Sequence, residues 1–295
     1  MQGSGSPRRY PLGIENTPSA TDPKARIDGV IAGKAPRAVI FRRGPSAVTQ
    51  QLVWNLNTDE VTPGEWIRAS VYTRRCDVSP NGKYLAGFYS NYAPTRMAKA
   101  AKEFKLKDPR EAAAWTAISF VNSFKSLGLW YQGNTYFGGG AWLANAKVEI
   151  HHPNAVNMAI PPPADIIGKR VETREVGFVW FARLEARGWQ RIKGAKRTLS
   201  KPDVAMQWFK RAPNGRLLYE SNRTDDVGQE TWTLFDKDGN PIRKWETEPD
   251  KPMFIDFDHR GRLIYGEGGC LYAWENWPQH APKLVADLNE SKCPI

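Results

Sequence analysis

The strongest constraint on the fold is a pattern that occurs four times: an apolar run, a polar turn with a glycine, and a second apolar run. A tight hairpin needs a residue that tolerates positive φ, and glycine does so without steric cost. The last two turn glycines are 46 residues apart, close to the length of a four-stranded propeller blade. The earlier intervals, 51 and 82 residues, indicate insertions. The turn glycines are Gly82, Gly133, Gly215 and Gly261.

Residues 136–143 and 265–271 carry nearly the same glycine-rich string, which we interpret as a hairpin between the second and third strands of a repeat. Residues 38–68 match second, third and fourth strands without a first, and closed propellers often complete one blade from both chain ends. We therefore predict an all-β fold, a β-propeller most simply built from five blades of four antiparallel strands. It forms one domain over residues 35–295 after a flexible N-terminal arm, residues 1–34. The aromatic segment after Val176 is expected to add two strands, which complete the third blade or belong to a sixth.

Two of the predicted hairpins have nearly the same turn, Ser-Pro-Asn-Gly at residues 79–82 and Ala-Pro-Asn-Gly at residues 212–215. Both resemble the SPDG hairpin of WD40-like and other bacterial propellers, although no Gly-His and Trp-Asp pair recurs at blade spacing. The N-terminal half also resembles uncharacterised bacterial proteins with FRRGPS, GxW and RRCD-SP-G motifs. These resemblances imply a propeller fold and bring no activity with them.

Residues 94–114 are the one stretch with a helical pattern, and we expect a short helical insertion in the second blade. Met97, Ala101 and Phe104 recur at helical spacing and are expected to pack on the sheets. Asp108 followed by proline, with a glutamate three residues later, predicts a second helix start. The side of the insertion that faces away from the sheets is expected to form a basic rim. Its residues are Lys99, Lys102, Lys105, Lys107 and Arg110.

Several classes of protein are excluded by what the sequence lacks. No apolar run approaches 18 residues, so no membrane span is expected, and no secretory h-region follows the N-terminal charges. Cys76, Cys270 and Cys293 are too few and too scattered for a disulfide framework or a zinc site. We expect a cytoplasmic protein without cofactor or metal; of His151 and His152, adjacent in a strand, only one could face a metal.

The formal net charge is +11, and its excess is local. Residues 67–110 carry +7 and residues 111–200 carry +5, whereas residues 247–295 carry −3. A basic arc on the second and third blades suits an acidic protein partner, nucleic acid, or the acidic last blade of a second copy.

Two doubled arginines are predicted at the ends of strands in neighbouring blades. Four such guanidinium groups could hold a phosphate or carboxylate in bidentate fashion. The alternative is internal pairing with Asp77, Asp59 or Glu60. The predicted anion-binding residues are Arg42, Arg43, Arg74 and Arg75.

Carboxylates at first-strand positions are the candidates for catalysis. A channel-centred glycosidase uses acids from different blades, one as general acid and one as base or nucleophile. Asp77 and Asp256 would form this pair, with Asp258 or Glu149 as modulator, and Asp203 is a further first-strand acid. The alternative is that these acids pair with Arg74, Arg75 and Arg260 or cap turns.

Most of the 12 tryptophans lie in predicted strands and are expected to fill the spaces between blades. Trp189 and Trp208 lie beside basic residues and are the candidates for stacking bases.

Three functions are consistent with these patterns. The first is a non-enzymatic propeller that acts as a protein-interaction or assembly module through its basic rim. The second is a nucleic-acid-binding module that uses the basic insertion. The third is a channel-centred hydrolase acting on a glycan or a phosphorylated small molecule.

Overall fold

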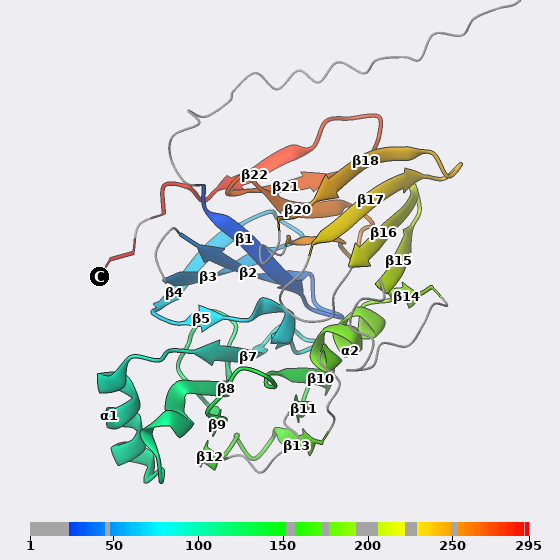
Figure 1. Ribbon diagram of the computed structural model, residues 1–295. Coiled ribbons are helices and arrows are strands. Elements are labelled where there is room, and N and C mark those ends of the chain that lie inside the picture. The colour runs from blue at the N-terminus through cyan, green and yellow to red at the C-terminus, as the bar shows by residue number, and fades with distance from the viewer. Residues whose placement is uncertain are drawn as a thin grey trace, which may run out of the picture.

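The computed structural model describes residues 24–44, 48–151, 157–172, 177–192, 206–221, 229–248, 253–291 and 293–294. Over these residues the protein is all-β, with five sheets and two α-helices (Figure 1). The predicted residues Asp203 and His152, and most of the predicted arm, lie outside the described residues.

The first sheet contains four antiparallel strands in chain order, and its first strand corrects a prediction. We expected no strand before residue 35, yet residues 26–31 pair along their full length with the next strand. The strand pattern in the sequence is weak here because Asp28 and Gly29 interrupt the apolar run. The structure explains the glycine, since a Cβ at Gly29 would collide with the ring of Phe254. The strands are β1 (Arg26–Ile31), β2 (Arg37–Arg43), β3 (Thr49–Asn55) and β4 (Val61–Ile67).

The second sheet confirms the predicted hairpin at residues 79–82. Gly82 has a φ of 68°, and the Ser79 hydroxyl accepts hydrogen bonds from the backbone N–H groups of Lys83 and Tyr84. The apolar strand that follows is buried along its whole length, as suits the middle of a sheet. The strand order is β12-β9-β8-β7-β5, and β6 also pairs with β7. The strands are β5 (Ser70–Val71), β6 (Asp77–Val78), β7 (Tyr84–Ser90), β8 (Ala114–Phe120), β9 (Gly128–Tyr131) and β12 (Asn157–Ile160).

The third sheet corrects the predicted hairpin at residues 136–143. β9 and β10 belong to different sheets, so the glycines there carry the chain from one sheet to the next. A Cβ at Gly139 would clash with the backbone carbonyl of Arg75, and Gly138 and Gly139 both have positive φ. Close passage of two backbones, rather than a hairpin, requires glycine here. The strands are β10 (Gly140–Ala144), β11 (Lys147–His151) and β13 (Ile167–Val171), the last parallel to β11.

The fourth sheet places aromatic rings opposite one another on adjacent strands. Trp208 pairs with Tyr219, Tyr219 with Trp232, and Trp232 with Trp245, and all four are buried. Such cross-strand aromatic pairs stabilise a sheet by about 0.2–1 kcal/mol each. The strands are β14 (Gln190–Arg191), β15 (Met206–Ala212), β16 (Gly215–Ser221), β17 (Glu230–Asp236) and β18 (Pro241–Glu246).

The fifth sheet confirms two predicted turns. Gly261 has a φ of 78°, and Gly268 and Gly269 form a hairpin with φ values of 59° and 82°. The strands are β19 (Ile255–Phe257), β20 (Leu263–Glu267), β21 (Cys270–Trp274) and β22 (Lys283–Asp287), all antiparallel.

The predicted helical insertion is confirmed as α1 (Pro94–Phe104). Ala101 is buried, while Met97 and Phe104 are half-buried against the second sheet. Asp108 caps the 3-10 helix η2 (Pro109–Ala113) by accepting a hydrogen bond from the backbone N–H of Arg110. A shorter 3-10 helix, η1 (Thr73–Arg75), precedes β6.

The segment after Val176 is a helix, α2 (Phe178–Ala186), and the prediction of a strand there was wrong. Its aromatic and apolar residues suit a strand in isolation, but the buried positions follow a helical spacing. Those positions are Val179, Trp180, Arg183 and Leu184.

Shared apolar clusters join the first sheet to the second, the second to the third, the fourth to the fifth, and the fifth to the first. Phe254, Ile264 and Leu271 of the C-terminal region join Ile27 and Ile40 in one cluster. α2 contacts both η1 and β10, and its Trp180 joins the core of the fourth sheet. Among the residues that the structure describes, only the first and fifth sheets have the predicted four strands in simple antiparallel order; the second has six strands, the third three and the fourth five. Within the described residues, no helix is long and apolar enough to cross a membrane.

Candidate functional site

One of the two predicted anion-binding arginines of β2, Arg42, has partners near the C-terminal end of the described residues. The Arg42 guanidinium donates to the backbone carbonyls of Leu288, at 3.0 Å, and Asn289, at 3.2 Å. Burial lowers the pKa of Arg42, and burial together with the neighbouring Arg26 lowers that of Arg43. Arg42 therefore joins the first sheet to the segment after β22.

The arginines of η1 are also engaged inside the protein. Arg74 donates to the Tyr219 hydroxyl at 2.9 Å and forms an ion pair with Glu230, while Arg75 donates to the backbone carbonyl of Thr135. The structure thus gives three of the four arginines separate internal partners, and an anion shared among them stays a prediction. Glu230 was not connected with Arg74 in the sequence, because 156 residues separate them.

Asp77 is completely buried and bound from two sides. Its Oδ1 accepts from Arg187 at 2.7 Å and from the backbone N–H of Val78, and its Oδ2 accepts from the backbone N–H of Trp142 at 2.8 Å. Burial raises the pKa of Asp77, while the charge of Arg187 and the N–H of Trp142 oppose this. With an exposed fraction of 0%, the carboxyl cannot contact a substrate.

Two arginines one helical turn apart, at the end of α2, join several sheets. Arg183 donates to the backbone carbonyls of Thr73 and Cys76 at 2.8 and 2.7 Å, and burial lowers its pKa to about 10. It is therefore charged at neutral pH. Arg187 donates to the backbone carbonyl of Ile31 at 2.7 Å as well as to Asp77. The i, i+4 spacing of these arginines was the signal that sequence reasoning missed.

Asp256 is half-buried and has a cation of its own. Its Oδ1 lies 2.7 Å from the Nζ of Lys210, and its Oδ2 lies 3.3 Å from the indole nitrogen of Trp189. Trp189 is only 3% exposed and Trp208 only 1%, so neither forms the base-stacking surface that was predicted. Trp189 instead packs edge-on against Trp232 in the core of the fourth sheet.

Asp258 lies in the turn after β19 and stabilises that turn. Its Oδ1 accepts the backbone N–H groups of Arg260 and Arg262, and its Oδ2 binds the Arg262 guanidinium at 2.8 Å. Arg260 also lies 3.9 Å from the carboxylate. This confirms, for Asp258, the alternative that the acid caps a turn and pairs with Arg260.

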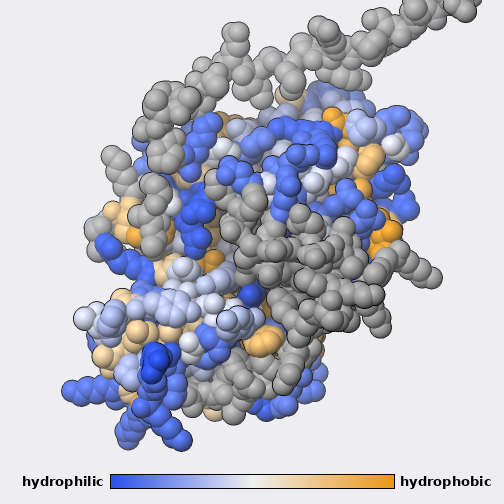
Figure 2. Space-filling view, in the orientation of Figure 1, coloured by the Kyte–Doolittle hydropathy of each residue, from blue (hydrophilic) through white to orange (hydrophobic). Residues whose placement is uncertain are grey.

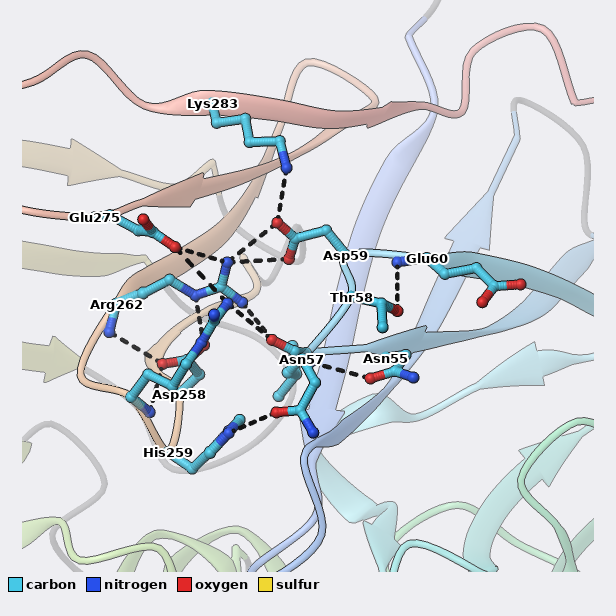
Figure 3. Close-up of polar contacts among 12 residues, drawn as sticks. Asn55, Asn57, Thr58, Asp59, Glu60, Asp258, His259, Arg262, Glu275 and Lys283 are labelled. Atoms are coloured by element: carbon cyan, nitrogen blue, oxygen red, sulfur yellow. Dashed lines mark hydrogen bonds and ion pairs between the residues drawn. The ribbon is translucent and has the colours of Figure 1, made fainter.

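Arg262 extends this turn into a charged cluster that joins the fifth sheet to the first (Figure 3). It pairs with Asp59, in the loop before β4, and donates to the backbone carbonyl of Leu56 at 2.6 Å. Lys283 of β22 binds the same Asp59 at 2.9 Å, and Glu275 lies 3.4 Å from Arg262. Burial raises the pKa of Asp59, but the hydrogen bonds and charges of the two cations outweigh it and bring the pKa below its usual value.

These contacts define what the three predicted acids can do. Asp77, Asp256 and Asp258 each bind a different cation, respectively Arg187, Lys210 and Arg262. A general acid requires a raised pKa, and Asp77, whose pKa burial raises, is closed to solvent. No group of three or more metal-ligating side chains occurs within the described residues. The geometry therefore suits cross-linking of sheets better than hydrolysis.

The basic rim differs from these internal clusters because it is open to solvent. Lys99, Lys102, Lys105 and Lys107 are all exposed, and none has an ion-pair partner among the residues that the structure describes. Figure 2 shows strongly hydrophilic side chains projecting from the lower left of the molecule, where Figure 1 places α1. Arg110, also exposed, is partly occupied by Asp108 at 3.2 Å.

α1 is held firmly although its outer face is free. The guanidinium of Arg96 lies 4.0 Å from the centre of the Trp115 ring and donates to the backbone carbonyls of Asn91 and Ala112. The ring of Phe104 packs against Tyr131. The lysines thus stand on a fixed support.

Comparisons with known proteins give no family for this chain. No family model matches it, and no curated protein matches its sequence. Among solved structures, the SapL1 lectin in complex with alpha methyl fucoside aligns over 91% of this chain and 81% of its own, with 7% identity and a TM-score of 0.28. An uncharacterized protein from Listeria monocytogenes aligns over 91% of this chain and 85% of its own, with 8% identity and a TM-score of 0.30. Scores this low support no conclusion about fold or function.

Proposed function

We propose that the protein is a non-enzymatic β-propeller that binds an acidic protein partner through the lysine face of α1, defined as Lys99, Lys102, Lys105 and Lys107. The observation that carries the proposal is that these four ammonium groups are exposed and lack ion-pair partners among the described residues. Lys99 and Lys102 lie in the anchored helix, and Lys105 and Lys107 lie directly after its end. The candidate catalytic acids Asp77, Asp256 and Asp258, by contrast, are each bound to a cation of the protein.

The propeller part of the proposal is supported by the way the sheets follow one another. The five sheets of the described residues follow one another along the chain except for β12, which belongs to the second sheet, and the fifth sheet contacts the first through Phe254 and Arg262. A contact between the last and first sheets is what a closed propeller requires, and a closed propeller gives a rigid support for a binding surface. Five blades would then correspond to the five sheets.

A protein partner is favoured over single-stranded nucleic acid because the two tryptophans predicted to stack on bases are not exposed. Trp189 and Trp208 are buried, whereas binding of single strands relies on exposed rings among cations. Tyr92, two residues before α1, is 57% exposed and is a residue type enriched where proteins bind one another.

The test compares two variants with equal changes in charge. One replaces the four lysines of the lysine face by glutamate; the other replaces four exposed lysines elsewhere, Lys125, Lys147, Lys169 and Lys237. Fluorescence anisotropy measures binding of labelled poly-glutamate and of a labelled oligonucleotide at several salt concentrations. We expect the lysine-face variant to bind poly-glutamate at least about tenfold more weakly, which is about 1.4 kcal/mol, and the control variant to change about twofold.

Equal losses in both variants would show that net charge alone drives binding and would refute the proposed face. Tighter binding of the oligonucleotide than of poly-glutamate at physiological salt, lost in the lysine-face variant, would replace the protein partner by nucleic acid.

A further inference from the structure

A pocket of about 240 Å³ lies away from α1, where three parts of the chain meet. Its walls are the β1–β2 turn over residues 31–35, the end of α2, and the segment from Phe257 to His259. Lys210 of β15 completes the lining. This volume is far larger than one water molecule needs, so a small ligand fits.

The charged side chains in the lining of this pocket are mostly cations. Lys34, Arg187 and Lys210 contribute to it, and Asp258 is its single carboxylate; His259 and small or apolar residues form the rest. Asp258 is already occupied by Arg262 and by two backbone N–H groups. Lys34 is exposed at the rim and has no ion-pair partner within the described part of the chain.

Arg187 supplies the feature that points to a ligand. Its side chain is 7% exposed, its Nε and Nη2 donate to Ile31, Asp77 and Val78, and its Nη1 makes no hydrogen bond to a described residue. A guanidinium has five N–H donors, so the two on Nη1 are available to a ligand in the pocket. A Cβ on Gly33, in the pocket wall, would lie 3.1 Å from this Nη1. The absence of a side chain at Gly33 therefore keeps the approach to the free donors open.

We propose that this pocket binds the phosphate group of a small phosphorylated molecule. The Nη1 donors of Arg187 and the ammonium groups of Lys34 and Lys210 supply the charge-assisted hydrogen bonds that a dianion requires. Lys210 is held in place by the Asp256 carboxylate at 2.7 Å and the Phe257 carbonyl at 3.2 Å, so its position is fixed before a ligand arrives. The rest of the volume accommodates the group that carries the phosphate.

The test uses isothermal titration calorimetry of the full chain with inorganic phosphate, glucose 6-phosphate and, as a monoanion control, acetate. The variants are Lys34→Ala, which removes a rim charge, and Gly33→Ala, which removes no charge but places a methyl group against Nη1. Gly33 does not have positive φ, so alanine is compatible with its backbone. The matched control is Lys125→Ala, an exposed lysine outside the pocket lining.

We expect the wild type to bind glucose 6-phosphate more tightly than inorganic phosphate, and both more tightly than acetate. Each pocket variant should weaken phosphate binding at least about fivefold, which is about 1 kcal/mol, with an unchanged melting temperature, and Lys125→Ala should stay within about twofold. No phosphate binding by the wild type at millimolar ligand would overturn the proposal. Equal phosphate affinities of the wild type and Gly33→Ala would overturn the role of Nη1. The pocket variants leave the lysine face of α1 unchanged, so this test is independent of the proposed function.

Discussion

α1 and α2 carry positive charge in opposite ways. On α1 the lysines Lys99 and Lys102 are exposed, and the helix packs through alanine and aromatic side chains and through Arg96, which is half-buried. At the end of α2 the cations are Arg183 and Arg187, nearly buried, which bind backbone carbonyls of the first and second sheets. Guanidinium groups present several donors in a fixed fork and are more weakly hydrated than ammonium groups, so they can replace water inside a protein. The difference teaches that the positive charge of this chain falls into two kinds, arginines bound inside the protein and lysines open to solvent.

The largest expected effect on stability comes from removing one of the buried arginines at the end of α2. Arg187→Met would leave Asp77 buried without its cation, and removing one partner of a buried pair typically costs about 3–5 kcal/mol. Urea unfolding followed by tryptophan fluorescence measures the loss. Arg110→Met, whose side chain is 84% exposed, is the control and should change stability by less than about 0.5 kcal/mol.

A double-mutant cycle shows whether the loss belongs to the pair. In an Asp77→Asn background, Arg187→Met should cost distinctly less than in the wild type, because no buried charge is left behind. Equal costs in both backgrounds would contradict the assigned ion pair.

An intermediate effect is expected where the first and fifth sheets meet. Asp59→Asn removes the charge that Arg262 and Lys283 share, while asparagine tolerates the positive φ of 61° at this position. Because the pKa of Asp59 is lowered in the folded protein, its carboxylate stabilises the fold above the unfolded pKa of about 3.9, and this contribution is lost as pH falls further. The variant should be about 1–2 kcal/mol less stable than the wild type at pH 7, and the difference should shrink below about pH 4.

Glu60→Gln is the matched control, since Glu60 is adjacent and exposed. Thermal melts across the pH range should show little difference from the wild type at any pH. A stability difference between Asp59→Asn and the wild type that stays constant down to acid pH would mean that the charge of Asp59 does not contribute to stability.

The smallest effect on stability is expected on α1. Replacing the four lysines of the lysine face by alanine removes no described ion pair, reduces repulsion between like charges three residues apart, and favours the helix. The free energy of unfolding, measured in urea, should therefore change by no more than about 0.5 kcal/mol in either direction. A loss above about 1 kcal/mol would show that these lysines support the fold and would remove the contrast with α2.

Much of the architecture was predictable where local chemistry decides it. The turns at Gly82, Gly215 and Gly261 and the start and packing face of α1 followed from glycine conformation and from helical periodicity. The strand at residues 26–31 and the helix α2 were missed for opposite reasons. A polar residue and a glycine obscure the first, and aromatic residues of high strand propensity obscure the second.

The internal ion pairs were less predictable because they join residues far apart in the chain. Arg187 pairs with Asp77 across 110 residues, and Arg262 pairs with Asp59 across 203. Sequence spacing carries no information about such partners; they depend on which sheets lie side by side. Of the cations that bind Asp77, Asp256 and Asp258, only Arg260 beside Asp258 was named from the sequence; Arg187, Lys210 and Arg262 were not.

The contact between Arg42 and the carbonyls of Leu288 and Asn289 also bears on how the chain is made. Synthesis begins at the N-terminus, so the first sheet is complete long before its partner at the other end exists. Until residue 289 has left the ribosome, the Arg42 guanidinium and the face of β1 that packs on β20 have only water as a neighbour from that side. Deletion of β22 and the residues after it should therefore destabilise the first sheet, which is synthesised earliest, as well as the fifth sheet.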